Sequence, residues 1–370
     1  MKTGLITFHN SYNCGSMLQT YALFNVLNRM GHDVEVIDFS NEGQRNVYSV
    51  FYRNNTLKNV IKNLLISLCH KKIARDFTRY EDFKKKHFSL SNRCYTDASQ
   101  LSDDTYDIVV TGSDQVWNIT IEDGDDAYFL PWVKTARKIA YAPSFGARNI
   151  MEYAKDPQRY ANYLKSFHSI SIRENNGKTW IKALANIDVP VIIDPTLLLS
   201  KCDYDKIAST ELSLPKKYIF YYSPGYSSDI NQLVKNISKK YKLPVIAFNA
   251  KHFYINRMFL TGMTVPKIED PSTYLQLIKN ATMIITTSFH GTIFSSIYNK
   301  CFWVVKNGNM FKTDDRVSTL VQGLDLMDRV IPIEFNDNFN YLADKDYTNY
   351  YQLLSTEQKK ALNFLEESFK

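Results

Sequence analysis

The sequence predicts an α/β protein with two doubly wound domains, each built on a parallel β-sheet. Three observations support this fold class. The chain has 370 residues, 44% hydrophobic and 22% charged, which is the composition of a globular protein long enough for two cores. It opens with a strand, a helix and a second strand within about 35 residues. Short apolar runs that end in small polar loops then alternate with helices along the rest of the chain.

The first strand–helix–strand unit occupies the N-terminus. Residues 5–8 form a short apolar run, and residues 9–16 are a polar loop. The helix that follows has apolar residues at a spacing of four: Leu18, Ala22, Val26 and Met30. Gly31 ends this helix, and residues 34–39 are predicted as the second strand.

The same pattern continues to the end of the chain. Further strands are predicted over residues 106–110, 138–142, 169–172, 191–193, 218–222, 245–248, 283–287 and 301–305, the last of which closes the second sheet. Helices are predicted over residues 228–240, from Asp270, after the loop 288–292, and in the tail from about Thr348. We expect an N-terminal domain over residues 1–168, a C-terminal domain over 169–330, and a helical tail over 331–370 that packs back on the first domain.

The formal net charge of +7 is concentrated in one segment. Residues 45–90 hold 11 Lys and Arg against 3 Asp and Glu. Within it, five apolar residues fall on one helical face: Val60, Ile61, Leu64, Leu65 and Leu68. One interpretation is a surface helical insert whose apolar face packs on the domain. The other is a patch that approaches an anionic membrane surface or a polyphosphate ligand, with Lys84, Lys85 and Lys86 taking part.

Several function classes are excluded. No run approaches the roughly 18 apolar residues of a membrane span, and the first residues are too short for a signal-peptide core. The five Cys are odd in number, widely spread and lack a CxxC pair, so they indicate neither a disulfide framework nor a zinc site. The glycines of dinucleotide-binding and P-loop motifs are absent. We therefore expect a cytoplasmic protein with no nucleic-acid partner.

Two loops that follow predicted strands contain the main candidate functional residues, because ligands of doubly wound sheets bind at the carboxyl ends of strands. His290 begins a helix, Gly291 beside it allows close approach, and free backbone N–H groups there favour anions. Its imidazole suits proton transfer to a bound anion; the alternative is a packed histidine at a helix cap. Arg173 suits bidentate carboxylate or phosphate binding; the alternative is a surface ion pair with Glu174 or another neighbour.

Two further loops carry polar groups that could orient a sugar. Residues 111–118 bring together a hydroxyl, a carboxylate, an amide and an indole, and their alternative role is an N-cap formed by Ser113 or Asp114. His9, Asn13 and Gln19 flank the first loop and are candidates for the same cleft.

In their order, these loops resemble those of the polysaccharide pyruvyl transferase family. The matching segments span residues 4 to about 325: residues 4–10 with Asn13, Gly15, 18–19 and 21–23; then 112–118; 141–146; 171–174; 194–198; and 288–292. The resemblance implies a GT-B-like fold, with two Rossmann-type domains facing a cleft. It also implies transfer of the enolpyruvyl group of phosphoenolpyruvate onto two hydroxyls of one sugar, giving a cyclic pyruvate ketal.

The resemblance implies roles for particular residues. His290 corresponds to the family's functional histidine, which acts as the acid, and Arg173 to the arginine that grips phosphoenolpyruvate. Some relatives carry a second Arg where this chain has Ser288. The positive charge that this Arg would offer to the anionic donor could instead come from Lys306, Arg316 or helix N-termini. The remaining candidate substrate-binding residues are Gly291, Thr292, Asn13, Gly15, Gln19, His9, Gly112, Ser113, Asp114, Gln115, Ser144 and Glu174. No metal or organic cofactor is implied; phosphoenolpyruvate is a co-substrate.

The resemblance also implies the partners. The expected acceptor is a lipid-diphosphate-linked or nucleotide-linked sugar for a capsule or exopolysaccharide, bound on the side of the N-terminal domain, with phosphoenolpyruvate on the side of the C-terminal domain. A lipid-linked acceptor would give the basic segment a use at the inner face of the cytoplasmic membrane. Two alternatives are a GT-B glycosyltransferase with a nucleotide-sugar donor and a non-catalytic carbohydrate-binding partner.

Overall fold

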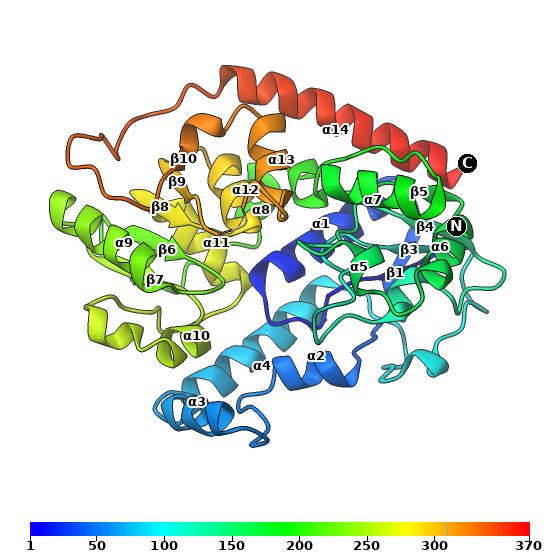
Figure 1. Cartoon of the computed structure of the whole chain (residues 1–370), viewed down its shortest axis with the longest axis horizontal. Helices are drawn as coiled ribbons and strands as arrows, with labels where there is room; N and C mark the ends of the chain where they lie inside the picture. Colours follow the sequence, from blue (N-terminus) through cyan, green and yellow to red (C-terminus); the bar gives the residue numbers. More distant parts are fainter. Residues whose placement is uncertain (309) are drawn as a thin grey trace.

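A computed structural model describes residues 1–308 and 310–370 and contains two five-stranded sheets (Figure 1). All strand pairs in both sheets are parallel. The first sheet has the order β2 (Asp33–Val36), β1 (Lys2–Ile6), β3 (Ile108–Thr111), β4 (Arg137–Ala140), β5 (Ser169–Ile170). The second has the order β10 (Val330–Ile331), β9 (Phe302–Val305), β8 (Met283–Thr286), β6 (Ile219–Tyr222), β7 (Val245–Ala247). The prediction of two doubly wound parallel sheets is confirmed.

The two sheets share one winding order, and this positions the functional site. In the first sheet the winding reverses between β1 and β3, and in the second it reverses between β6 and β8. In such sheets ligands bind in the crevice outside the carboxyl ends of the strands at this switch point. Both domains therefore have a predicted crevice at equivalent places.

The helices alternate with the strands. Their bounds are α1 (Cys14–Arg29), α2 (Glu42–Val47), α3 (Leu57–Ser67), α4 (His70–His87), α5 (Ile150–Tyr153), α6 (Pro157–Lys165), α7 (Asn175–Ala185), α8 (Lys201–Asp205), α9 (Ser228–Tyr241), α10 (Ala250–Ile255), α11 (Pro271–Asn280), α12 (Phe289–Ile297), α13 (Arg316–Gly323) and α14 (Thr348–Phe369). Short 3-10 turns are η1 (Ala98–Gln100), η2 (Asp126–Phe129), η3 (Pro195–Leu198), η4 (Met258–Thr261) and η5 (Met327–Arg329).

The boundary between the domains lies later than residue 168. β5 pairs with β4, so residues 169–170 belong to the first sheet. Ile181 and Val189 are buried in the core of the first domain. The apolar residues of α7 cover this sheet, which explains why the chain stays with the first domain. Two strand predictions also differ: residues 191–193 form only an isolated bridge from Val191, and β10, not β9, is the edge of the second sheet.

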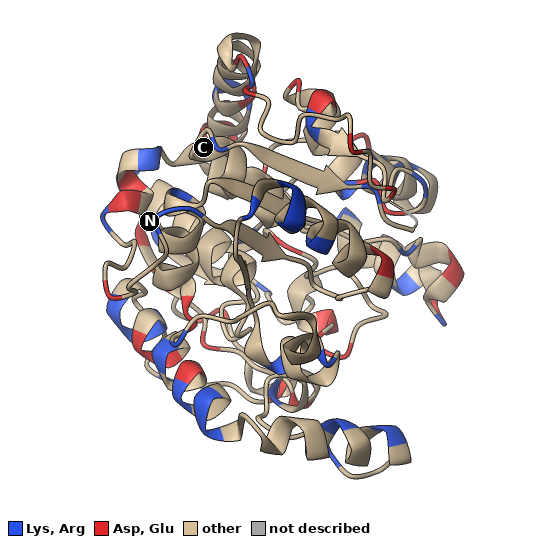
Figure 2. Ribbon diagram, turned by 90° about the vertical axis from the view of Figure 1, so that its left-hand side faces the viewer, with Lys and Arg blue, Asp and Glu red and all other residues tan. Residues whose placement is uncertain are grey.

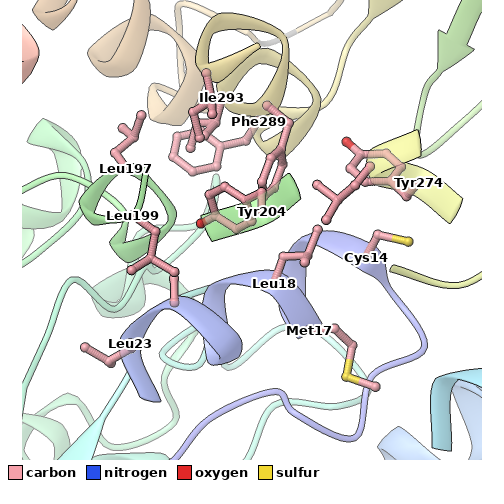
Figure 3. Packing of buried hydrophobic residues seen from close by; sticks show 14 of the residues in the cluster. Cys14, Met17, Leu18, Leu23, Leu197, Leu199, Tyr204, Tyr274, Phe289 and Ile293 are labelled. Carbon is pink, nitrogen blue, oxygen red and sulfur yellow. The ribbon is translucent and has the colours of Figure 1, made fainter. Parts of the chain in front are cut away.

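The domains share an apolar core around α1 (Figure 3). Leu18 of α1 faces Tyr204 and Phe289, with Leu197 and Leu199 of the connecting segment beside them. The Tyr204 hydroxyl donates to the carbonyl of Thr196 at 2.8 Å, so this buried ring keeps its polar group bonded. Continuous packing from one domain to the other holds their facing crevices in a fixed relation.

The tail and the basic segment lie on opposite sides of the molecule. In Figure 1, α14 runs across the top and ends beside the first domain, where the ring of Phe369 lies 4.1 Å from that of His32. The basic segment forms α2, α3 and α4 at the bottom. Lys84 is buried and donates to Glu81 at 3.0 Å, so it is not a surface cation. No helix within residues 1–308 and 310–370 has the length and apolar character to cross a bilayer.

Candidate active site

A cleft of about 330 Å³ lies between the two switch points. Loops after β1, β3, β6 and β8 line it, together with residues from the end of α2 and the start of α13. Its polar lining consists of Asn13, Ser16, Tyr48, Asp114, Gln115, Asp123, Arg173, Tyr222, Thr287, Ser288, His290, Asp314 and Arg316. The parallel strands explain this gathering, because their carboxyl ends lie at one edge of each sheet.

Arg173 is held at the floor of the cleft. Its Nη1 donates to Oδ2 of Asp194 at 2.8 Å, and Nη2 lies 3.5 Å from Oδ1 of Asp114. The guanidinium also stands over the ring of Phe289, 4.3 Å from its centroid. Its Nε is buried and has no hydrogen-bond partner among the described residues. Arg173 is thus rigidly oriented and retains one free donor.

His290 occupies the second position of α12. Ser288 caps the helix by accepting from the backbone N–H of Gly291 at 3.2 Å. Nε2 of His290 lies 3.4 Å from Oδ2 of Asp194 and makes no hydrogen bond within the described chain. The ring therefore lies beside a carboxylate and at a helix N-terminus, in a cleft whose lining also holds two arginines and three aspartates.

Asp194 links the two candidate catalytic groups. One of its oxygens faces both Arg173 and His290, and the other accepts from the hydroxyl of Thr196 at 2.7 Å. Burial alone would raise the pKa of Asp194, but His290 and Arg173, with the Thr196 hydrogen bond, hold that pKa well below its ordinary value. Asp194 is therefore a carboxylate that positions its neighbours.

Arg316 supplies a second cation to the cleft. Its Nε and Nη2 donate to the two oxygens of Asp314 at 2.8 and 2.6 Å. Lys306 is exposed and does not line the cleft. Lys306 and Arg316 were the two side chains expected to supply the positive charge that a second arginine provides in some relatives. Of these two, only Arg316 lines the cleft.

A carboxylate with a raised pKa lines the same cleft. Burial raises the pKa of Asp123 to about 6, and the nearby charges of Asp114 and Glu122 add to the shift. Within the described residues no Lys or Arg forms an ion pair with Asp123. Asp123 can therefore exchange a proton near neutral pH.

A second cavity of about 390 Å³ lies on the other side of Arg173, Asp194 and Phe289. Its remaining lining comes mainly from residues 191–193 and from α13 and α14. Neither His290 nor Arg316 reaches it. Since proton transfer and anion binding need such groups, the cleft between the switch points is the candidate active site.

The predicted site residues divide into two groups. His290, Arg173, Ser288, Asn13, Asp114 and Gln115 line the cleft. The others stand behind it: His9, Gly15, Gln19, Gly112, Ser113, Ser144, Glu174, Gly291 and Thr292.

The residues behind the cleft use their polar groups within the protein. The Gln19 amide donates to the Thr7 hydroxyl at 2.9 Å, and the Ser113 hydroxyl donates to the carbonyl of Ala142 at 2.6 Å. Glu174 accepts from the backbone N–H of Phe145 at 2.9 Å and is not the ion-pair partner of Arg173. These groups shape the loops that line the cleft.

Sequence reasoning did not select Asp194, Asp123 or Tyr48. Asp194 follows an apolar run in a segment that carries the family resemblance, so its position was a usable signal. Asp123 and Tyr48 lie in irregular segments with no motif, and only the fold brings them to the cleft. Among the described residues no group of three or more His, Cys, Asp and Glu side chains could hold a metal ion.

Comparisons with known proteins identify the chain's relatives. The family model described as polysaccharide pyruvyl transferase matches residues 13–309. No curated protein matches the sequence.

Three solved structures are similar in fold. A putative UDP-N-acetylglucosamine 2-epimerase from Listeria monocytogenes has a TM-score of 0.50 at 7% identity, covering 100% of this chain and 96% of the epimerase. The UDP-GlcNAc 2-epimerase of Neisseria meningitidis has a TM-score of 0.49 at 10% identity, covering 99% of this chain and 100% of the epimerase. The E. coli heptosyltransferase WaaC has a TM-score of 0.39 at 10% sequence identity, covering 96% of this chain and 99% of the heptosyltransferase. The Listeria similarity and the sheet topology together show a GT-B-type fold.

Proposed function

The chain belongs to the polysaccharide pyruvyl transferase family, a family of enzymes, and from this premise we propose that it transfers the enolpyruvyl group of phosphoenolpyruvate onto two hydroxyls of one sugar residue. The product is a cyclic pyruvate ketal. The observation that carries the proposal is the convergence of Arg173, Arg316 and His290 on one cleft. Two guanidinium groups suit a ligand with both a carboxylate and a phosphate.

The donor anion would bind at the side of α12. Arg173 offers a buried Nε donor without a partner among the described residues, and Arg316 lies on the same cleft. The N-terminus of α12 adds the positive end of its helix dipole. These groups would balance part of the charge on phosphoenolpyruvate and fix its orientation, with Arg173 and Arg316 themselves held by aspartates.

The proposed chemistry begins with a proton from His290. This proton adds to the methylene carbon of phosphoenolpyruvate, which becomes a methyl group and leaves an oxocarbenium-like centre at the adjacent carbon. One sugar hydroxyl attacks this centre and loses its proton. The bond to phosphate then breaks, and the second hydroxyl attacks the same carbon with loss of its proton. The proton of the first hydroxyl passes through Asp123 to the departing phosphate, and the proton of the second hydroxyl restores His290.

Asp123 is proposed as the base that accepts a hydroxyl proton. It lines the cleft with His290 and has a pKa of about 6, so it is mostly ionised at neutral pH yet basic enough to accept a proton. Asp194 is a positioning residue that holds Arg173 and the imidazole of His290.

We propose a lipid-diphosphate-linked or nucleotide-linked sugar of a capsule or exopolysaccharide as the acceptor, modified in the cytoplasm. The family supports a saccharide acceptor. The scheme uses no metal or organic cofactor, because His290, Asp123 and the arginines supply its proton transfers and charge stabilisation.

Calorimetric titration with phosphoenolpyruvate tests this function without knowledge of the acceptor. We expect saturable binding to the wild type and at least about tenfold weaker binding to Arg173→Ala and to Arg316→Ala. Arg316→Ala leaves the ion pair of Arg173 and Asp194 intact, so its effect does not depend on the stability of that pair. Arg148→Ala, at an exposed arginine outside the cleft, is the matched control. Equal binding by all four proteins would place the donor elsewhere, and no binding by the wild type would reject this donor.

A further inference from the structure

The outer face of α3 is apolar and exposed. Leu57 and Leu64 are 76% and 71% exposed, and Leu68, at the end of the helix, is 65% exposed. Val60 and Ile61 are each nearly half exposed. The expected packing of this face on the domain is therefore only partial. Several large apolar side chains on one short helix exceed the scattered exposure normal for a soluble surface.

This apolar surface continues onto the second domain. A groove of about 730 Å³ runs between α3 and α10 and is lined by Ile61 and Leu65 on one side and Ile255 on the other. Beyond α10, Leu260 in the turn η4 is 73% exposed. The surface thus combines residues that are nearly 200 positions apart in the chain.

The charged side chains that line the groove have one sign. No Asp or Glu occurs between Glu42 and Asp76, or between Asp229 and Glu269. Lys58, on the outer side of α3, lines the groove together with Lys62 and Arg257 and forms no ion pair among the described residues. In Figure 2, α3 at the bottom of the molecule carries blue turns and no red ones, whereas α4 carries both colours.

We propose that α3, with the groove that it forms with α10, docks on an anionic lipid bilayer. Exposed leucines enter the boundary between headgroups and acyl chains, while neighbouring lysines meet anionic headgroups. An apolar patch alone would also suit a protein partner, but a groove lined by Lys58, Lys62 and Arg257 and by no carboxylate is complementary to an anionic surface. The lysines at 84–86, which first suggested membrane contact, are not the centre of this surface.

The docking surface adjoins the candidate active site. Pro224 lines both the groove and the cleft. The segment between α2 and α3 also connects them, since Tyr48 lines the cleft and Tyr52 lines the groove. Lys251 of α10 holds this segment by donating to the carbonyl of Ser49 at 2.7 Å. A sugar carried by a bilayer lipid would therefore meet the cleft beside the membrane; this consequence, unlike the docking, rests on the proposed function.

Co-sedimentation with vesicles tests the docking. The purified full chain is mixed with vesicles of phosphatidylcholine alone or with phosphatidylglycerol added, without substrates. We expect binding only to the vesicles that contain phosphatidylglycerol, weakening as salt increases. The double variant Leu64→Ser/Leu68→Ser should bind at least about tenfold less, because two apolar anchors are lost. Lys58→Gln/Lys62→Gln should also bind less.

Controls separate docking from other causes. Leu342→Ser removes an exposed leucine far from α3 and should bind like the wild type. Thermal melts and phosphoenolpyruvate titration should be unchanged in the α3 variants, so a failure of docking is distinct from a failure of the proposed function. The proposal would be overturned if the wild-type protein did not co-sediment with vesicles that contain phosphatidylglycerol. So would α3 variants that bind vesicles normally but lose self-association in light scattering, since that result would assign the surface to a second copy of the chain.

Discussion

The imidazole ring of His290 lies directly against Gly15. A Cβ atom added at Gly15 would come 2.2 Å from Nδ1 and 2.6 Å from Cγ of the ring. Gly15 lies in the first turn of α1 in the first domain, and His290 lies in the first turn of α12 in the second. The absence of a side chain at Gly15 therefore lets a residue of one domain stand at the carboxyl edge of the other.

Gly15→Ala should displace His290 while leaving the fold intact. Neither the ring nor the backbone of α1 can accept a contact of 2.2 Å, so the imidazole must leave its present place beside Asp194. We expect kcat for phosphate release to fall about a hundredfold, because a small displacement of a reacting group is costly. Gly323→Ala, whose Cβ would meet nothing within 4 Å, should retain wild-type kcat. Full activity in Gly15→Ala would show that the position of His290 does not limit the reaction.

Arg316→Gln should weaken binding of phosphoenolpyruvate. The substitution removes a cation from the cleft but keeps a side chain that can donate to Asp314. We expect Kd to rise at least about tenfold, with partial recovery in Arg316→Lys. Lys306→Gln removes one charge outside the cleft and should leave Kd unchanged. A similar loss in both Gln variants would indicate a general charge effect instead.

Asp123→Asn should change the pH dependence of the reaction. A carboxylate base is active when ionised, so wild-type kcat should rise as the pH passes through about 6, the raised pKa of Asp123. In the variant this rise should disappear and kcat should fall by roughly a hundredfold or more. Glu122→Gln, at the exposed neighbouring carboxylate, should keep the rise. A profile that stays the same in Asp123→Asn would assign the base to another group.

Glu174→Gln should make the free energy of unfolding less dependent on pH. Burial raises the pKa of Glu174 to about 7, only partly offset by Arg173 and Arg316. The folded state therefore binds the proton more tightly than the unfolded state, and wild-type stability should decrease as the pH rises from about 4.5 to about 7. The decrease attributable to this group is roughly 3 kcal/mol.

Denaturant titrations at pH 5 and pH 8 measure this dependence. Relative to the wild type, Glu174→Gln should gain stability at the higher pH. Glu152→Gln, at an exposed glutamate, should follow the wild type at both values. A parallel pH dependence in wild type and Glu174→Gln would mean that Glu174 is ionised throughout.

The local elements of the fold were readable from sequence because each leaves a short-range signature. The helix after residue 13 has its apolar residues at helical spacing and Gly31 beyond its end, and the structure places it at Cys14–Arg29. The loop 288–292 follows an apolar strand, which marked His290 as a titratable side chain at a strand end. Where such a signature is weak, as at residues 191–193, the strand prediction was wrong.

Sequence alone therefore determined the alternation of strands and helices and the class of fold, since these follow from hydrophobic period. The choice of His290 and Arg173 rested on residue type at strand ends together with the resemblance of the loops to the family. Tertiary structure alone decided that Asp194 joins Arg173 to His290, that Arg316 and not Lys306 faces the cleft, and that the apolar face of α3 stays exposed. These outcomes depend on contacts between segments far apart in the chain. The local sequence pattern carries no information on such contacts, because the burial and ion pairing of a side chain depend on residues from distant segments that the fold places next to it.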